Sequence, residues 1–279
     1  MILRDQGDTL RVVTQTDHAH WGYLLLSAWP ALGDHPRRAA ILRATRQHDR
    51  GWQGIDASPV IDENGRPHDF RSLPTFLRED VWNQTVDRNL WPSEAPSTVD
   101  EAMEMWAEML IAQHAWRVHR PGPSGLPGSI RHSEELLPLA TQLAAERRER
   151  LQWIQQNFDQ LSPFLGLQEP ERDLERDDSW VRTLDFISLV VCHGWTEARD
   201  FVVETTDSRG SESEFRFSAE FAKEHLVLSP NPLKGTVRVP LRCRETENRT
   251  FESNRAWAMT LARTPWSSRE ISVGGSMAD

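Results

Sequence analysis

The chain has 279 residues and a formal net charge of −10, and 38% of its residues are hydrophobic. This composition supplies enough apolar material for a folded core and excludes a disordered chain. The acidic balance provides no basic surface for the phosphate backbone, so we expect no nucleic-acid partner. With only two cysteines, the chain has neither a disulfide framework nor a thiolate zinc cluster.

The sequence also lacks the marks of a membrane or secreted protein. No segment combines the length and apolar character of a membrane span, and the first residues do not have the pattern of a secretory signal. We therefore expect a cytoplasmic protein with no membrane partner. The sequence does not set an oligomeric state.

The N-terminal region predicts a small β-hairpin followed by a helix. Short apolar runs at 2–4 and 9–14 are separated by a turn-prone cluster, which is typical of a hairpin. Thr16 or Asp17 is a suitable cap for the helix that follows. On this helix His18 lies in the first turn of the apolar face.

A second helix is predicted over 37–50, with His48 continuing its apolar stripe. The next stretch, 53–75, holds too many prolines and turn residues for a helix. Structureless loops of this length are usually functional or disordered. Because the loop begins directly after the pair His48-Asp49, we favour a functional loop.

Three further helices are expected, and two of them carry a polar residue on a packed face. The helix over 99–119 places His114 on its apolar stripe, and the apolar helix over 179–194 contains Asp185 as its one acid. A charged amphipathic helix over 133–160 lies between them.

After residue 199 the pattern changes to short strand-like runs with turn residues between them. The runs lie at 201–205, 215–217, 226–228 and 237–241, and one more helix is expected over 253–263. The expected fold is therefore mainly α, a helical bundle with a short N-terminal β-hairpin and a small strand-containing C-terminal annex. We expect residues 1–199 to form the helical body and residues 200–279 the α/β annex.

The inward-facing polar residues are candidates for one metal site. In chain order they are His18, His48-Asp49, His114 and Asp185, assigned to four different helices. Neutral imidazoles and carboxylates together suit zinc, manganese, iron or nickel, whereas calcium prefers oxygen ligands alone. We expect His18, His48, Asp49 and Asp185 to bind one divalent transition-metal ion, with His114 as the extra ligand of a second ion.

The order His18, His48-Asp49 and Asp185 resembles the His…His-Asp…Asp signature of the HD superfamily. Members of that superfamily are helical metal-dependent phosphohydrolases and, in one subgroup, di-iron oxygenases. The resemblance implies that the helical body is an HD-like bundle.

The chain as a whole is more similar to an uncharacterised bacterial family known only as a domain of unknown function. The similarity covers most of the chain and rests on Thr14-Gln15-x-Asp17-His18-Ala19, Gln47-His48-Asp49-x-Gly51-Trp52, Gly65-Arg66-Pro67-x-Asp69-Phe70 and Leu184-Asp185-x-x-Ser188-Leu189-x-x-Cys192. The family's usual Ser-Leu-His block is replaced here by Ala112-Gln113-His114, a departure that bears on the second metal more than on the first.

Each candidate also has a plain structural interpretation. A single inward histidine is by default a core residue hydrogen-bonded to a backbone carbonyl. Asp185 would equally be neutralised by a nearby arginine such as Arg182. Trp52 and Trp82 stand out among the tryptophans because they flank the long loop.

We expect a metal-dependent hydrolase of HD-like type that acts on a small anionic, phosphorylated substrate. In this hypothesis His114 is a second-ion ligand or a general acid/base, and Arg46 or Arg50 holds the anion. Two alternatives remain open: a di-iron oxygenase built on the same site, and a non-catalytic helical protein whose polar cluster organises the core.

Overall fold

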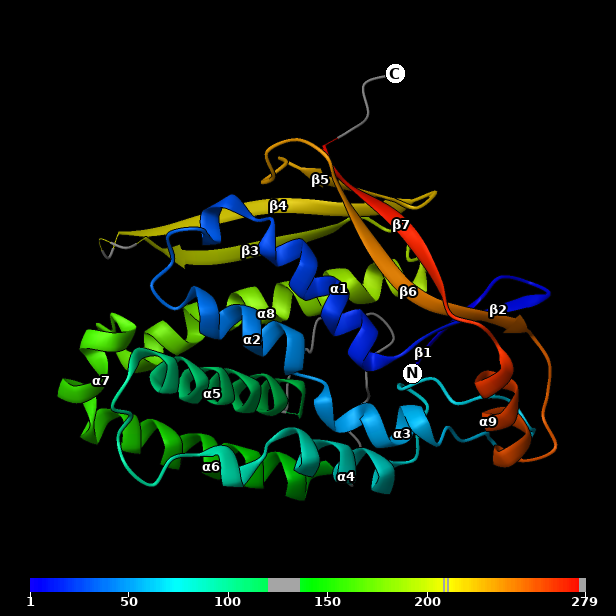
Figure 1. Ribbon diagram of the computed structural model, residues 1–279, viewed down its shortest axis with the longest axis horizontal. Helices are drawn as coiled ribbons and strands as arrows, with labels where there is room; N and C mark the ends of the chain where they lie inside the picture. The colour runs from blue at the N-terminus through cyan, green and yellow to red at the C-terminus, as the bar shows by residue number, and fades with distance from the viewer. Residues whose placement is uncertain (120–135, 208, 210, 276–279) are drawn as a thin grey trace.

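The computed structural model describes residues 1–119, 136–207, 209 and 211–275. Its helices and strands form two parts that pack on each other, a group of helices and a curled sheet (Figure 1). Of the residues that the structure describes, 51% are helical and 21% are in strands. Within the described residues, no helix combines the length and apolar character needed to cross a bilayer.

The sheet has seven strands in the order β1-β2-β6-β7-β5-β4-β3. Neighbouring strands are antiparallel, except that β5 and β7 are parallel. The bounds are Ile2–Asp5 for β1, Thr9–Val13 for β2, Arg199–Thr206 for β3, Glu212–Ala222 for β4, His225–Ser229 for β5, Val237–Glu247 for β6 and Ser267–Gly274 for β7.

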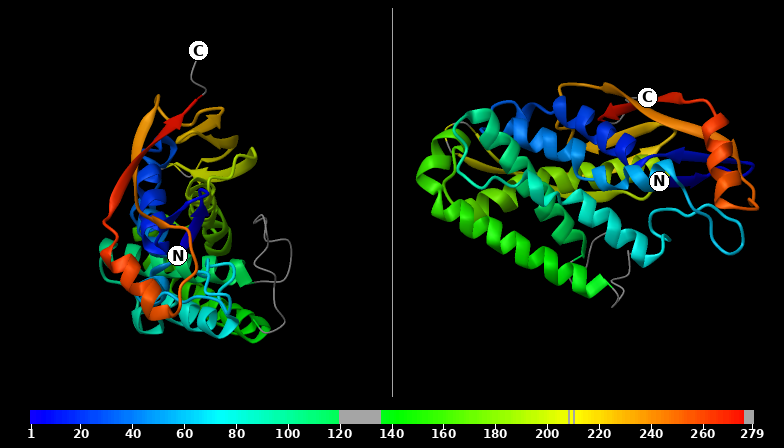
Figure 2. Two further views of the ribbon diagram at one scale, coloured as in Figure 1. Left: turned by 90° about the vertical axis from the view of Figure 1, so that its right-hand side faces the viewer. Right: turned by 60° about the horizontal axis from the view of Figure 1, so that its bottom comes forward.

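The helices lie mainly along one side of this sheet (Figure 2). They are α1 (Gln15–Ser27), α2 (Arg38–Gln47), α3 (Gln53–Ala57), α4 (Thr75–Thr85), α5 (Val99–His119), α6 (Leu137–Gln156), α7 (Phe158–Leu165), α8 (Pro170–His193) and α9 (Asn254–Arg263). Helix α8 contacts α1, α2 and α5, and it also packs against strand β3. It is therefore the element that joins the helical group to the sheet.

The expected fold class, a mainly α HD-like bundle with a small annex, is wrong. The N-terminal hairpin does form, but its strand β2 pairs with β6, so Val12 lies opposite Arg244 in a seven-stranded mixed sheet. The runs after residue 199 are long strands of the same sheet. Local periodicity indicates that a strand is present but does not identify its partner, which here lies more than two hundred residues away.

Most of the predicted helices are present with shifted ends. Helix α1 begins at Gln15 because Thr14, not Thr16 or Asp17, accepts the capping bond from the Asp17 amide. The helix predicted over 133–160 is α6, and its first three residues lie outside the described part of the chain. The stretch 53–75 is largely irregular, as expected, apart from the short helix α3.

Two glycines allow the close packing that brings the polar residues together. A Cβ on Gly22 of α1 would lie 3.3 Å from the Leu184 carbonyl oxygen of α8. A Cβ on Gly51 would lie far inside van der Waals contact with the Val81 carbonyl oxygen of α4. A side chain at Gly51 would clash with α4, whereas one at Gly22 would require a shift of a few tenths of an ångström, so both glycines favour close packing, of α4 beside the end of α2 and of α1 on α8.

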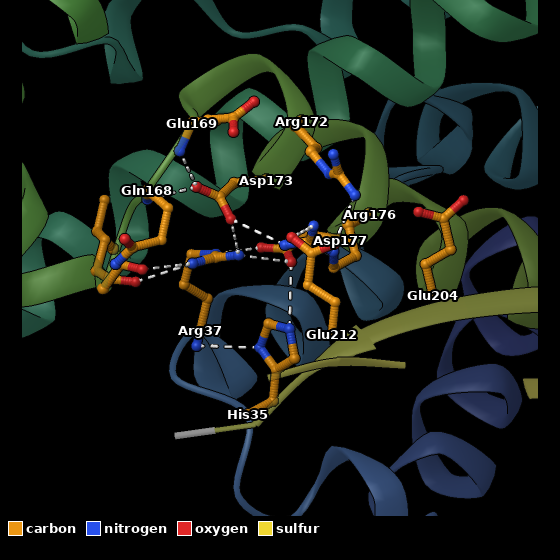
Figure 3. Close-up of polar contacts among 12 residues, drawn as sticks. His35, Arg37, Gln168, Glu169, Arg172, Asp173, Arg176, Asp177, Glu204 and Glu212 are labelled. Atoms are coloured by element: carbon orange, nitrogen blue, oxygen red, sulfur yellow. Dashed lines mark hydrogen bonds and ion pairs between the residues drawn. The ribbon is translucent and has the colours of Figure 1, made fainter. Parts of the chain in front are cut away.

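A buried ion cluster joins the start of α2 to the first turns of α8 (Figure 3). The Arg37 guanidinium is fully buried and donates to Asp177 at 2.5 and 3.1 Å and to Asp173 at 3.0 Å. The indole of Trp106 donates to Asp177 at 2.7 Å, and the His35 imidazole lies 3.3 Å from the same carboxylate. We call these residues the Arg37 cluster.

Candidate metal centre

Four of the predicted ligands meet at the opposite end of α2. His18 comes from the first turn of α1, His48 directly follows the last residue of α2, Asp49 is next in the chain, and Asp185 comes from the middle of α8. One ligand atom of each residue lies within 4.8 Å of all the others. The first three side chains are buried and Asp185 is partly buried. We call these residues the His-Asp cluster.

Hydrogen bonds fix which nitrogen of His18 carries a proton. The Ser188 hydroxyl donates to the Asp185 backbone carbonyl at 2.7 Å, so its oxygen accepts a hydrogen bond from the N–H of His18 Nδ1, also at 2.7 Å. In the neutral imidazole, Nε2 then carries a lone pair. This lone pair faces Asp49 Oδ2 at 2.7 Å.

The same logic applies to His48. Its Nδ1 lies 2.9 Å from the Thr45 carbonyl oxygen, which can only accept, so Nδ1 is the protonated nitrogen. Its Nε2 lone pair faces Asp185 Oδ1 at 3.3 Å and Asp49 Oδ2 at 3.6 Å. Two imidazole nitrogens and two carboxylates therefore converge, and a proton or a metal ion between them makes this arrangement favourable.

The electrostatics of the His-Asp cluster agree with that need for positive charge. Burial alone would lower the pKa of His48, but the charge of Asp49 and the hydrogen bond and charge of Asp185 raise it to about 9. Burial would raise the pKa of Asp185, yet the neighbouring imidazoles lower it well below its ordinary value. In the absence of a metal, a proton on His48 supplies the missing positive charge.

The donor set fits a divalent transition metal. Nitrogen and oxygen bonds to zinc are roughly 2.0–2.2 Å long, which places neighbouring ligand atoms roughly 3 Å apart. The nitrogen–oxygen distances of 2.7, 3.3 and 3.6 Å in the cluster bracket that spacing. Ser188 and Thr45 hold the far nitrogens of the two imidazoles, as partners of metal-binding histidines usually do.

His114 of α5 lies beside the cluster but outside the group of four. Its ring packs edge-on against His48 with centroids 4.8 Å apart, and its Nε2 is 3.7 Å from Asp185 Oδ2. Burial, followed by the charge of His48, lowers the pKa of His114 to about 4. His114 is therefore a neutral imidazole, and its buried Nδ1 has no hydrogen-bond partner among the described residues.

A cavity of about 30 Å³ adjoins the cluster, which is room for one or two water molecules. Asp49, Asp185 and His114 form part of its wall. The other lining residues are Gln15, Trp52, Phe70, Arg78, Trp82, Val118, His119 and Leu189. Trp52 and Trp82, the two tryptophans that flank the long loop, thus both reach the candidate site.

The two arginines proposed to hold an anion lie elsewhere. Arg50 forms a two-pronged ion pair with Glu108 at 2.6 and 2.7 Å, and Arg46 lies over the ring of Tyr23 at 5.5 Å. Arg182 is exposed, and within the described residues the charged partners of Asp185 are imidazoles. The arginine that lines the cavity is Arg78.

Arg78, Gln15 and Ser188 were not singled out from the sequence as site residues. Gln15 and Ser188 belong to the sequence blocks Thr14-Gln15-x-Asp17-His18 and Leu184-Asp185-x-x-Ser188, which carry the family resemblance. These blocks could therefore have identified both residues as site candidates. Arg78 on α4 had none, because its guanidinium is positioned by the Leu73 and Arg71 carbonyls of the preceding loop.

A family model described as a protein of unknown function, DUF3891, matches residues 1–247. The match carries no link to the HD superfamily. No curated protein and no solved structure matches the chain.

Proposed function

Because the chain belongs to this family of unknown function, we propose from the site alone that the protein is a divalent-metal-dependent hydrolase of a small anionic substrate. One observation carries the proposal. Nδ1 of His18 and of His48 contacts Ser188 and the Thr45 carbonyl, so each Nε2 faces the carboxylates of Asp49 and Asp185, and one ligand atom of each of the four residues lies within 4.8 Å of the others.

The position of the cluster favours catalysis over a purely structural role. Four protein ligands would close a tetrahedral zinc site, whereas a five- or six-coordinate ion held by the same four ligands keeps a position open to water or substrate. Asp49 and Asp185 form part of a cavity wall, so a bound ion would lie at the edge of that cavity. A divalent cation held there would activate water and stabilise negative charge in the reacting group.

Some of the side chains that line the cavity have a buried polar atom without a hydrogen-bond partner among the described residues. The buried Gln15 Oε1, Trp52 Nε1 and His114 Nδ1 have no hydrogen-bond partner among the described residues, although their side chains line the cavity. Buried polar groups without partners are costly, so water or a polar ligand is the natural occupant. In our assignment His114 takes or gives the proton during hydrolysis, and Gln15 and Trp52 orient the water or the substrate.

Arg78 is the cation best placed for the anionic part of the substrate. Its guanidinium is held against the cavity by donating to the carbonyls of Leu73 and Arg71 at 2.8 and 2.6 Å. The small volume of the cavity suits the reacting end of a substrate and not a large molecule. The chain order His18, His48-Asp49, Asp185 resembles the order of the metal ligands in HD hydrolases. Our proposal rests on the chemistry of this ligand set and not on the HD fold.

The test is elemental analysis of the purified protein after loading with Zn²⁺, Mn²⁺ or Fe²⁺, with hydrolysis of 4-nitrophenyl phosphate and bis(4-nitrophenyl) phosphate as the activity readout. We expect stoichiometric metal in the wild type and its loss in His48→Ala. His20→Ala, which removes an imidazole from another face of α1, is the matched control and keeps its metal. Asp185→Asn preserves the shape of the side chain and serves as a second ligand variant.

Each other outcome points to a different function. Equal metal content in the wild type and in His48→Ala would disprove the ligand assignment and favour a polar cluster that only organises the core. Stoichiometric metal without hydrolysis of either ester would overturn the hydrolase. Two irons per chain with an absorption band in the visible range would favour a di-iron oxygenase instead.

A further inference from the structure

A second cavity, of about 370 Å³, lies where α3, α9 and the start of α1 meet strand β6. This volume is in the range of small-molecule sites, about 300–1,000 Å³. Among the described residues, this cavity shares no lining residue with the cavity of the metal centre. We call it the α9 cavity.

Arg244 gives the α9 cavity a positive charge that the protein itself does not neutralise. Its Nε is buried without a hydrogen-bond partner, and no carboxylate of the described residues lies within ion-pair distance. Its guanidinium packs on the Trp266 ring with 4.0 Å to the centroid, and Arg242 packs on the same ring at 3.8 Å. Arg242 has Asp17 at 3.6 Å, so of these two arginines Arg244 is the one without an acid.

The electrostatics of Arg244 agree with an unmet positive charge. Burial, followed by the charge of Arg242, lowers the pKa of Arg244. An arginine fork matches the two oxygens of a carboxylate or phosphate, and packing on an indole ring leaves the edge of the guanidinium available for such contacts. A bound anion would supply the charge and the acceptors that Arg244 lacks.

Part of the lining of the α9 cavity is apolar. It is formed by Val12 of β2, Pro59, and the α9 side chains of Ala258, Leu261 and Ala262. Thr16 and Gln53 add polar groups, and the lining carboxylate of Asp56 is paired with the N-terminal amine of Met1 at 2.7 Å. A ligand that contacts both Arg244 and the apolar lining has one anionic end and one apolar end.

We propose that the α9 cavity binds a small amphipathic anion, a carboxylate or phosphate monoester that carries an apolar group. Its anionic end contacts Arg244 and its apolar end lies against α9. This site is independent of the metal centre and of hydrolysis. The two are nevertheless connected through α1, because Thr16 lines the α9 cavity and His18 belongs to the His-Asp cluster.

The experiment is isothermal titration calorimetry of the full chain in EDTA, which removes metal from the other site. The probes are hexyl phosphate and hexanoate, with inorganic phosphate and acetate as their counterparts without the apolar group. Burial of each methylene contributes about 0.8 kcal/mol, so we expect at least one six-carbon anion to bind about tenfold or more tighter than its counterpart. Whichever six-carbon anion binds tighter identifies the anionic group.

Variants test the contributions of Arg244 and of the apolar lining separately. Arg244→Gln is expected to weaken binding of the six-carbon anion at least about tenfold, because charged hydrogen bonds contribute roughly 1.5–3 kcal/mol. Arg238→Gln removes an exposed arginine from the same face of β6 and should leave affinity unchanged. Ala262→Leu fills the cavity from an exposed position and should also weaken binding.

Three results would overturn the proposal. They are absence of binding by both six-carbon anions, equal affinity for the six-carbon anions and their counterparts, and unchanged affinity in Arg244→Gln with a native circular dichroism spectrum.

Discussion

The two ends of helix α2 carry buried polar clusters that look alike in composition and differ in how their charge is balanced. Both join α2 to acids of α8, and they lie roughly 15 Å apart along a helix that rises about 1.5 Å per residue. In the Arg37 cluster a buried guanidinium donates to the carboxylates of Asp173 and Asp177. In the His-Asp cluster the carboxylates of Asp49 and Asp185 face imidazole nitrogens that have no proton to give in the neutral state.

The difference separates a structural cluster from a binding site. Each oxygen of Asp173 and Asp177 has a donor: besides Arg37, the amides of Gln168 and Glu169 donate to Asp173, and Trp106 donates to Asp177. The Arg37 cluster is therefore complete without a ligand. The His-Asp cluster is completed only by a cation from outside the chain, a proton or a metal ion.

The largest expected effect comes from removing the cation of the Arg37 cluster. Arg37→Met removes the arginine that is paired with the buried Asp177, while Asp173 keeps Arg176 at 3.2 Å. Breaking a buried ion pair in this way typically costs about 3–5 kcal/mol. We expect the free energy of unfolding, measured by urea denaturation, to fall by that amount. Arg43→Met is the control, because Arg43 on the same helix forms an exposed pair with Glu104 and such pairs contribute about 0–1 kcal/mol.

Equal losses in Arg37→Met and Arg43→Met would show that the Arg37 cluster does not hold α2 on α8. A loss of metal binding in Arg37→Met, with the fold intact, would instead show that the two clusters act as one unit.

The His-Asp cluster was more predictable from the sequence than the Arg37 cluster. Helical periodicity placed His18 and Asp185 on packed faces, and His48-Asp49 followed from the end of the α2 pattern, so convergence was a reasonable expectation. Arg37 gave no such signal because it stands beside Arg38 at the start of the predicted helix, and arginines are mostly exposed in folded proteins. Its partner Asp177 is 140 residues away on a helical turn that we had not assigned.

The sheet was the part of the fold that the sequence could not specify. Most of its strands were recognised as short runs, but β7 was missed because only Ile271, Val273 and Gly274 of its residues are buried. Strand pairing depends on which edges meet after the helices have packed, and no local pattern records this. The same limit applies to the proposed anion contact: Arg78 lines the cavity because of the path of the 58–74 loop, whereas Arg46 and Arg50 are close to His48 in sequence but do not line the cavity.

Addition of metal should change the free energy of unfolding by a smaller amount, but it should distinguish the two clusters more sharply. A ligand that binds only the folded state stabilises it by about 2.7 kcal/mol at a hundredfold excess over its dissociation constant. We expect Zn²⁺ or Mn²⁺ at that excess to raise the free energy of unfolding of wild-type protein and of Arg37→Met by this amount. Asp185→Asn should not respond. A response of the same size in Asp185→Asn would place the bound metal outside the His-Asp cluster.

The smallest effect, taken per pH unit, concerns pH, where the two clusters should behave in opposite ways. The pKa of His48 is raised to about 9 in the folded chain, against about 6.5 for a free imidazole. Without metal, the stability that protonated His48 contributes is fully present below pH 6.5 and is lost as the pH rises through 9. In the Arg37 cluster, burial raises the pKa of Asp177 but the Arg37 charge lowers it further, so its contribution is lost only in acid.

Metal and proton therefore compete for one place in the His-Asp cluster. Below pH 9 a bound metal must displace the His48 proton, so Mn²⁺ affinity should rise up to about tenfold per pH unit between pH 6.5 and 8, or about 1.4 kcal/mol. Calorimetry in buffers of different ionisation enthalpy would report about one proton released per metal. Over the same interval the stability difference between the wild type and Arg37→Met should stay constant without metal. An Mn²⁺ affinity that does not change with pH would mean that the cation does not occupy the space between His48 and the two carboxylates, because that space cannot hold a proton and a metal at once.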